Sequence, residues 1–300
     1  MTVMPASASP DAGPDSKPAA GPAAAAASGS DPRADHRHDG SDDTPVLTIR
    51  DGAIATVVLN RPAKLNAMTL SMWQQLGDAF RALSADDGVR CVIVRGAGER
   101  AFSPGNDIGE FAQARSNKAQ ATAYGKVMHA TAEALQDCRH PVVAQIHGIC
   151  VGGGLEIAAM ADIRICGQGS RFGAPIKNLG LVMAHAEMAP LIRLIGESRT
   201  LELLFEGRIV GADEAHGMGL VSRVVPDDQV AAEAAATAQR IASGAPLVAR
   251  WHKKFARQLA AGTPLSERER DEAFDCFDTE DFRTGYRAFL AKQTPEFHGR

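Results

Sequence analysis

The sequence predicts an α/β protein in which strands and helices alternate along most of the chain. Two β-branched runs, at 46–50 and 54–59, flank an Asp-Gly turn and predict a hairpin. Short apolar runs further along the chain alternate with stretches whose apolar residues recur at helical spacing. The C-terminal part reads as almost wholly helical over its last ~80 residues. This strand-then-helix rhythm is typical of α/β architecture.

The individual elements follow from the same patterns. After the hairpin, a helix is predicted from Thr69, which is a plausible N-cap residue. Apolar residues recur at helical spacing along this helix: Met72, Leu76, Phe80 and Leu83. Buried strands are predicted at 91–94, 142–146 and 163–166, and helices at 119–135, 155–160, 228–242 and 246–259.

Three regions differ in composition. Residues 1–44 are rich in Ala, Pro and Asp and almost lack large apolar residues. Such a segment cannot bury enough surface to offset its ordering entropy, so we expect a disordered tail. It lacks the features of a secretory signal, and its acidic residues argue against a mitochondrial presequence. We expect a folded core at 45–245 and a C-terminal helical region at 246–300.

Composition excludes several classes of protein. The 300 residues are 45% hydrophobic and 23% charged, with a net charge of −4 and both signs interspersed, which argues against a nucleic-acid-binding domain. No apolar run approaches the ~18 residues of a membrane span. The five cysteines are odd in number and form no CxxC pair, which favours reduced core thiols and a cytoplasmic location. No cluster has the spacing of a metal site.

A run of three glycines, Gly152 to Gly154, follows a predicted strand and opens a predicted helix. Glycine permits close backbone approach, and a helix N-terminus offers free N–H groups, so this is a place to hold an anion or a developing oxyanion. A phosphate-binding P-loop is excluded because no Lys-Ser/Thr follows. Glu156 falls in the first helical turn, where it is either a catalytic carboxylate or simply stabilises the helix terminus.

Three segments in a set order carry a family resemblance: 59–69, 101–111 and 147–157. With further matching stretches at 172–175, 179–181, 205–215, 219–226 and 289–297, the chain resembles the enoyl-CoA hydratase/isomerase (crotonase) superfamily over about 46–300. The resemblance implies a crotonase-type spiral of ββα turns with a helical C-terminal region. It also implies a homotrimer or homohexamer in which C-terminal helices cover the active site.

The resemblance assigns roles by position. The backbone N–H groups of Asn106 and Gly153 are expected to polarise the thioester carbonyl of an acyl-CoA substrate, with Glu156 as the general base. Other positions are expected to bind the CoA ester: Lys64, Ser103, Pro104, Gly105, Asp107, Ile108, Gly152 and Lys292. For the two lysines, a solvated surface position is an equally good interpretation. CoA arrives with the substrate, and no other cofactor or metal is expected.

The sequence departs from the family where a second glutamate is usual. Ile176 stands at that position, and a Gly-rich stretch of the family is replaced by 182–189. Glu187 or His185 from this altered segment could restore a partner for Glu156; otherwise both are surface or helix-cap residues. Hydration of a 2-enoyl-CoA is the leading hypothesis, since Glu156 could handle both proton transfers. Double-bond isomerisation and a non-catalytic acyl-CoA-binding role stay as alternatives.

Overall fold

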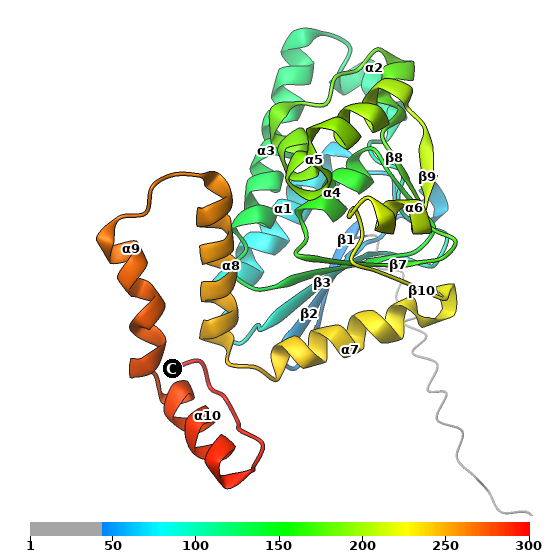
Figure 1. Ribbon diagram of the computed structural model, residues 1–300. Coiled ribbons are helices and arrows are strands. Elements are labelled where there is room, and N and C mark those ends of the chain that lie inside the picture. Colours follow the sequence, from blue (N-terminus) through cyan, green and yellow to red (C-terminus); the bar gives the residue numbers. More distant parts are fainter. Residues whose placement is uncertain (1–43) are drawn as a thin grey trace, which may run out of the picture. The chain divides into compact units, whose positions relative to one another are not determined.

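The computed structural model describes residues 44–300, which belong to one compact unit by their contacts. The tail predicted at 1–44 lies, except for Thr44, outside the described residues. The boundary predicted after residue 245 falls between helix α7 (Val230–Ala242) and helix α8 (Pro246–Ala261). Core and C-terminal region therefore belong to one unit, in which helices surround two sheets (Figure 1).

The strands form two sheets. In the first, the order is β1-β2-β3-β5-β7-β10, with β1 and β2 antiparallel and the other neighbours parallel. In the second, the order is β4-β6-β8-β9, and only β8 and β9 are antiparallel. The strands of the first sheet are β1 (Val46–Asp51), β2 (Ile54–Leu59), β3 (Cys91–Gly96), β5 (Val142–Ile146), β7 (Ile163–Gly167) and β10 (Arg223–Val225). Those of the second are β4 (Ala101–Ser103), β6 (Ile149–Val151), β8 (Arg171–Gly173) and β9 (Ile209–Gly211).

Successive strands alternate between the sheets before each helix. The chain runs β3 then β4, β5 then β6, and β7 then β8, and a helical segment follows each pair. This repetition is a spiral of strand–strand–helix turns, so the predicted fold class is confirmed. Each turn brings the end of a short strand of the second sheet next to the start of a helix, which is where the functional site forms.

The predicted helices are present, and the structure adds α5 (His185–Glu206), which was not among them. Thr69 caps α1, accepting a 3.2 Å hydrogen bond from Met72 N, and the strand-following glycines open α4. Besides α7 and α8, the helices are α1 (Leu70–Ala85), α2 (Phe111–Ala114), α3 (Lys118–Asp137), α4 (Gly153–Met160), α5 (His185–Glu206), α6 (Ala212–Gly217), α9 (Glu267–Asp271) and α10 (Glu280–Ala291). Short 3-10 helices are η1 (Pro62–Lys64), η2 (Ile108–Glu110), η3 (Pro175–Leu179), η4 (Asp227–Gln229) and η5 (Glu272–Asp278).

The three-residue strands were not predicted from the sequence. Strands β4, β6, β8 and β9 are too short to display a period-2 pattern, so periodicity alone could not find them. Strand β10 also corrects the expectation of an almost wholly helical C-terminal part. It extends the first sheet by pairing Val224 with Cys166 of β7, a long-range contact that the local sequence does not encode.

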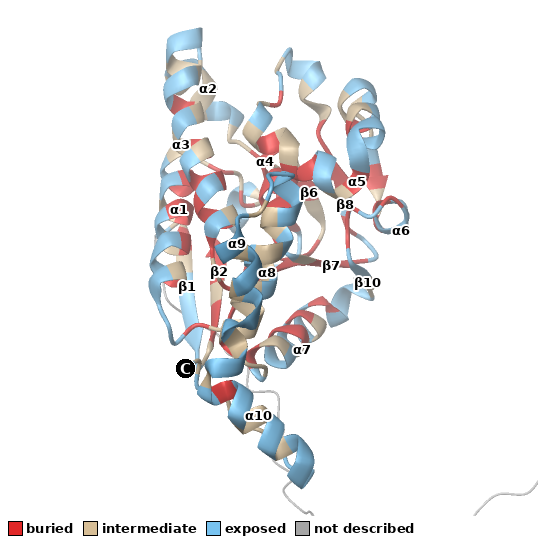
Figure 2. Cartoon of the chain, turned by 60° about the vertical axis from the view of Figure 1, so that its left-hand side comes forward, coloured by how far each residue is buried: buried red, intermediate tan, exposed pale blue. Residues whose placement is uncertain are grey.

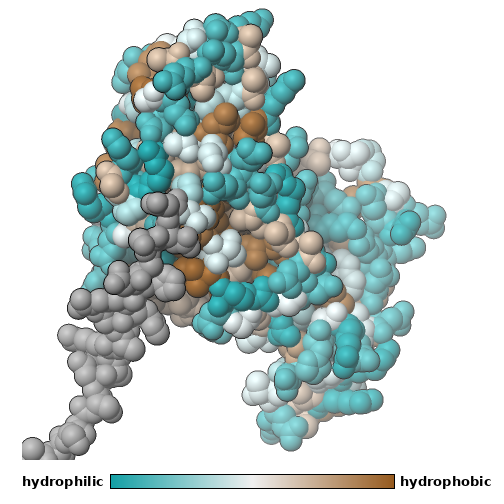
Figure 3. Space-filling model, turned by 180° about the vertical axis from the view of Figure 1, so that it is seen from behind, coloured by the Kyte–Doolittle hydropathy of each residue, from teal (hydrophilic) through white to brown (hydrophobic). Residues whose placement is uncertain are grey.

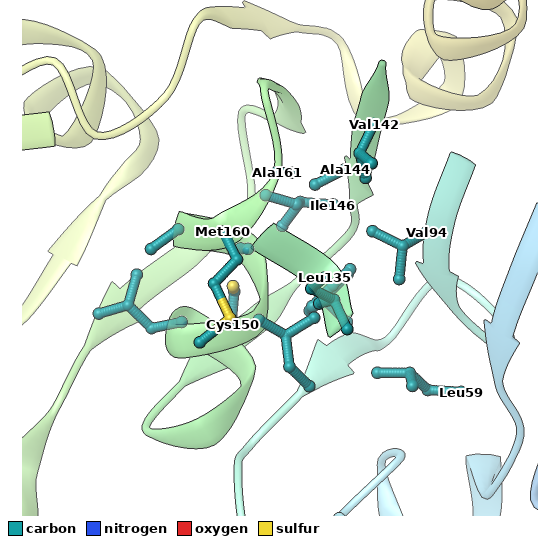
Figure 4. Close-up of a cluster of buried hydrophobic side chains, with 14 of the residues drawn as sticks. Leu59, Val94, Leu135, Val142, Ala144, Ile146, Cys150, Met160 and Ala161 are labelled. Atoms are coloured by element: carbon teal, nitrogen blue, oxygen red, sulfur yellow. The ribbon is translucent and has the colours of Figure 1, made fainter. Parts of the chain in front are cut away.

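The main core lies between the two sheets and the helices that follow them. Figure 4 shows Leu59 and Val94 from the first sheet near Leu135 of α3 and Met160 of α4. Each fully buried aliphatic side chain of this kind stabilises the fold by roughly 1.5–3 kcal/mol. Figure 2 shows that burial concentrates in the strands and α4, so the start of α4 is held in a rigid setting.

The C-terminal helices have a different surface. Lys253 of α8 forms a 2.6 Å ion pair with Asp162, which ties α8 to the core. Beyond α8, Figure 2 shows α10 largely exposed. Large apolar residues of this region face solvent: Phe274, Phe277, Phe282, Tyr286, Phe289 and Leu290. Elsewhere, on the face shown in Figure 3, apolar patches are interspersed among hydrophilic residues. No helix within 44–300 combines the length and apolarity needed to cross a membrane.

Candidate active site

A cavity of about 370 Å³ lies where the segment after β4, the start of α4 and η3 come together. The polar and glycine residues of its lining are Asn106, Asp107, Gly152, Gly153 and Glu156. Apolar side chains complete the lining: Ala67, Pro104, Ile108, Phe111, Val151, Pro175, Ile176, Leu179 and Leu181. The three segments singled out in the sequence therefore meet at one cavity.

The turn after β4 is held tightly against the glycine run. Gly105 has φ +97°, and a Cβ on it would lie 2.7 Å from Gly153 N, so no side chain fits there. Ser103 is fully buried; its hydroxyl accepts from Gly105 N at 3.1 Å and donates to Asn66 O at 2.9 Å. Met68 fixes the other side, since its N donates to Gly105 O at 2.8 Å and its O accepts from Asp107 N at 2.8 Å.

Two backbone N–H groups remain free in this arrangement. Within 44–300, neither Asn106 N nor Gly153 N donates to a protein acceptor. The neighbouring Gly105 N and Asp107 N do donate to protein acceptors. Gly153 is the first residue of α4, where backbone donors have no partner inside the helix and carry a partial positive charge. Two such donors lining one cavity can stabilise negative charge that develops on a substrate oxygen.

Trp73 supports both donors and was missed in the sequence. Its Nε1 donates a 2.6 Å hydrogen bond to Asn106 Oδ1, and its Cζ2 would be 2.9 Å from a Cβ on Gly153. It lies on the buried face of α1, next to Met72. The available signal was a tryptophan, one of two in the chain, on the core face of a predicted helix. That signal does not distinguish a tryptophan that only packs in the core from one that also positions Asn106 and Gly153.

Glu156 is the buried acid of the cavity. It is 6% exposed, and its Oε2 has no hydrogen-bond partner within 44–300. Burial raises the pKa of its carboxyl to about 8; the nearby Glu187 charge adds to this effect, and Arg115 opposes it. A buried carboxyl with its pKa near neutrality can both take and give a proton under physiological conditions.

Glu187 and His185 were the two candidate partners of Glu156 in the segment 182–189. Glu187 is buried and His185 is exposed. Glu187 lies in the first turn of α5 and is 5% exposed, close enough to Glu156 to raise its pKa. Glu187 Oε1 contacts His129 Nε2 of α3 at 3.2 Å, whereas its Oε2 has no partner within 44–300. His185 is the first residue of α5, is exposed, and does not line the cavity.

The predicted CoA-binding residues fall into two groups. Pro104, Asp107, Ile108 and Gly152 line the cavity, while Ser103 and Gly105 are buried behind it. Lys64 ends η1 and is exposed; its charge acts on Asp107, whose pKa is lowered chiefly by a hydrogen bond from Gly109 N.

For Lys292, the structure shows the solvated surface position that the sequence left open as one interpretation. Lys292 is exposed at the end of α10 and does not line the cavity of its own chain. No residue of 246–300 lines this cavity either, and the resemblance implied C-terminal helices over the site only within a homotrimer or homohexamer. Ile176 does line the cavity, so an apolar side chain occupies the position where the family usually has its second acid.

No arrangement of three or more His, Cys, Asp or Glu side chains suited to a metal ion occurs within 44–300. All five cysteines are free; four are buried and Cys276 is partly exposed. Burial raises the pKa of the Cys91 and Cys166 thiols to about 12, so these thiols are unreactive core residues.

The fold and cavity define a class of protein: a spiral of strand–strand–helix turns whose cavity combines free backbone donors with a buried carboxyl. Comparison with known proteins gives the family. The family model "Enoyl-CoA hydratase/isomerase" matches residues 50–300. The chain is 32% identical over 253 residues to the short-chain-enoyl-CoA hydratase of Clostridium acetobutylicum, covering 84% of this chain and 96% of that protein. It is 30% identical over 254 residues to the crotonyl-CoA hydratase of Syntrophomonas wolfei, covering 84% and 97%.

Solved structures agree. An enoyl-CoA hydratase/carnithine racemase from Magnetospirillum magneticum superposes with a TM-score of 0.84 at 49% identity, covering 85% of this chain and 96% of that one. An enoyl-CoA hydratase from Bacillus anthracis superposes with a TM-score of 0.80 at 30% identity, covering 85% and 100%. The chain belongs to the enoyl-CoA hydratase/isomerase family.

Proposed function

We propose that this protein hydrates a 2-enoyl-CoA to a 3-hydroxyacyl-CoA. The observation that carries the proposal is a single cavity lined by Asn106, Gly153 and Glu156, with both backbone N–H groups free and the carboxyl buried. Relatives named as hydratases, at 30–34% identity over most of the chain, support the same reaction.

The proposed reaction uses Glu156 for both proton transfers. The Glu156 carboxylate takes a proton from water as the water oxygen bonds to C3, and the C2=C3 electron pair moves toward the thioester carbonyl. The N–H groups of Asn106 and Gly153 hold the resulting enolate oxygen; one such donor is typically worth ~3 kcal/mol. Glu156 then delivers the proton to C2, so that one water is added and the carboxylate is restored.

Glu187 is proposed as the partner of Glu156 in place of the acid missing at Ile176. Its support is burial in the first turn of α5 and its electrostatic effect on Glu156. Glu187 does not line the cavity, so it acts through Glu156 rather than on the substrate. His185 has neither property, and we assign it no role.

We propose that the CoA portion lies along the cavity wall formed by Pro104, Asp107, Ile108 and Gly152, with Lys64 near its outer end. Ser103 and Gly105 contribute by shaping this wall. Lys292 is exposed and outside the cavity of its own chain, so any contact with CoA phosphates would be made from a neighbouring chain. Addition of water is redox-neutral, so the proposed reaction needs no redox cofactor. The backbone donors at Asn106 and Gly153 supply the charge stabilisation that a Lewis-acid metal would otherwise give. The free thiols support a cytoplasmic location.

We propose that the protein assembles as a homotrimer or a dimer of trimers through the C-terminal helices. Phe289 is 82% exposed and Phe274 is 66% exposed, which is costly for an isolated chain. Covering this face with another copy would also bring C-terminal helices over a neighbouring cavity. Light scattering measures the mass, and Phe289→Glu should lower it to that of a monomer. A monomeric wild-type protein would contradict this assembly.

The decisive experiment follows absorbance at the enoyl-thioester band with crotonyl-CoA and, separately, with a 3-enoyl-CoA. Loss of conjugation with crotonyl-CoA is the expected result. Glu156→Gln should abolish turnover while leaving CoA-ester binding intact, and Glu133→Gln, at an exposed position of α3, is the matched control. A rise in absorbance with the 3-enoyl substrate alone would instead identify an isomerase. Tight binding with no change on either substrate would identify a non-catalytic acyl-CoA-binding protein.

A further inference from the structure

Three helices bring three titratable side chains together behind the cavity. Glu156 comes from α4, Glu187 from α5 and His129 from α3, and each pair of these helices is in contact. Only Glu156 lines the cavity. The set therefore leads from the cavity wall away from the place where the substrate would lie.

Burial changes along this set. The Glu156 residue is 6% exposed, the Glu187 side chain is likewise 6% exposed, and the His129 side chain is 41% exposed. Glu187 Oε1 contacts His129 Nε2 at 3.2 Å. On the inner side, Glu156 Oε2 and Glu187 Oε2 are both buried and lack a partner within 44–300. Buried polar atoms are normally satisfied, and unpaired ones call for a functional explanation.

An unpaired buried carboxyl presents a problem of proton access. Burial favours the protonated form of Glu156, which must lose its proton before it can act as a base. When substrate fills the cavity, the cavity mouth is no longer an open path for that proton. Neither Glu187 nor His129 lines the cavity, and the His129 side chain is 41% exposed at the protein surface.

We propose that Glu187 and His129 form a proton relay that exchanges the proton of Glu156 with solvent. The proposal rests on the proposed function only in assigning Glu156 the task of moving a proton at the substrate. Glu187 and His129 are positioning and exchange residues, since neither lines the cavity.

No hydrogen bond joins Glu156 and Glu187 within 44–300, so the proposed relay includes one water between their unpaired Oε2 atoms. The Glu156 carboxyl gives its proton to this water, and the water gives a proton to the Glu187 carboxylate. Glu187 gives a proton to Nε2 of neutral His129, and the resulting imidazolium releases one to water. The net change is one proton moved from Glu156 to solvent, and the reverse sequence loads Glu156 again. No redox partner or leaving group is involved.

Other charges near the relay are few. Arg115, at the end of α2, is the cation that acts on Glu156, and its guanidinium lies 4.8 Å from the ring centroids of Phe111 and Tyr124. Glu187 from α5 is the one anion acting on Glu156 among 44–300, and His129 from α3 is the one side chain within ion-pair distance of Glu187 there. His129 is therefore the direct link between the buried carboxyls and water.

The test measures deuterium exchange at C2 of a saturated ester, butyryl-CoA, in D₂O, alongside hydration of crotonyl-CoA. Exchange requires Glu156 to remove a C2 proton and then swap it for solvent deuterium. His129→Gln should slow exchange at least tenfold at low buffer concentration with little change in KM. Added imidazole should restore the rate in a concentration-dependent way. Because His129 is half-exposed, this variant should fold normally, and His252→Gln, at an exposed position of α8, is the matched control.

Each outcome decides between the two proposals. Slow exchange in His129→Gln with imidazole rescue supports the relay even if crotonyl-CoA is not hydrated, which would sink the hydratase proposal alone. Normal exchange in His129→Gln, or slow exchange that imidazole does not restore, overturns the relay and leaves hydration standing. A wild type that performs neither reaction overturns both. Glu187→Gln should also lose exchange, without imidazole rescue, and the double variant should lose no more than Glu187→Gln.

Discussion

The indole Nε1 of Trp73 donates a 2.6 Å hydrogen bond to Asn106 Oδ1, which joins α1 to the turn after β4. The same indole packs on Gly153, so a single side chain contacts both residues that supply free backbone N–H groups. The distance between two donors decides how well they hold one oxygen. Trp73 is therefore the side chain that fixes this distance.

The first prediction concerns this bond. Trp73→Phe keeps an aromatic ring on Gly153 but removes the donor to Asn106. A neutral hydrogen bond contributes ~1 kcal/mol, so we expect kcat for hydration to fall about fivefold with little change in KM. Asn106→Ala removes the acceptor of the same hydrogen bond and keeps the backbone N–H, so kcat should fall by a similar factor. The double variant should lose no more kcat than either single variant. Trp251→Phe, at the other tryptophan, should be silent. If the losses of kcat add in the double variant, the two side chains do not act through the hydrogen bond between them.

The second prediction concerns the glycine run. A Cβ on Gly153 would lie 2.9 Å from Trp73 Cζ2 and 3.3 Å from Gly105 Cα. Gly153→Ala should therefore force the two donors apart and lower turnover by roughly 100-fold, the usual cost of losing one such donor. Gly153→Val should abolish turnover and weaken ligand binding. Gly125→Ala is the matched control, because a Cβ there meets nothing within 4 Å and alanine favours the α3 helix. Full activity in Gly153→Ala would refute the donor assignment.

The local sequence predicted much of this site, and for identifiable reasons. Three glycines between a strand and a helix have few structural explanations, so a place to hold an anion at the start of α4 could be predicted from the residues. The roles of Gly153 as a donor and Glu156 as the base came from the family resemblance. The role of Trp73 could not be predicted, since its bond to Asn106 joins residues 33 apart in the chain. The inward turn of Glu187 and the outward position of His185 likewise depend on where α5 begins relative to α3. A sequence of alternating polar and apolar residues does not fix that relation.

The third prediction concerns the pH dependence of turnover. As a base with its pKa raised to about 8, Glu156 should make kcat/KM for hydration rise with pH and level off above about 8. Glu187 raises this pKa, so Glu187→Gln should move the rise to lower pH. Arg115 lowers it, so Arg115→Gln should move the rise to higher pH. Shifts in the same direction for both variants, or a rate that falls through pH 8, would contradict Glu156 as the base.

The fourth prediction concerns stability. Because the pKa of Glu156 is about 8 when folded and has its ordinary value of 4.5 when unfolded, the folded state keeps a proton that the unfolded state loses. The stabilising contribution is therefore fully present below pH 4.5 and is lost as pH rises through about 8. Over this interval, the loss in free energy of unfolding is roughly 4–5 kcal/mol.

Glu156→Gln removes this titration while keeping nearly the same shape. Urea unfolding at pH 5 and pH 8.5 should therefore show the wild type losing several kcal/mol relative to Glu156→Gln at the higher pH. Glu133→Gln, whose carboxyl is exposed, should follow the wild type at both values. If the wild type and Glu156→Gln lose stability in parallel, the carboxyl is not held protonated by its surroundings. The pH-dependent rise in turnover would then need another source. If the loss of stability instead levels off near pH 8, the pH at which the kinetic midpoint lies, both effects belong to the same buried carboxyl.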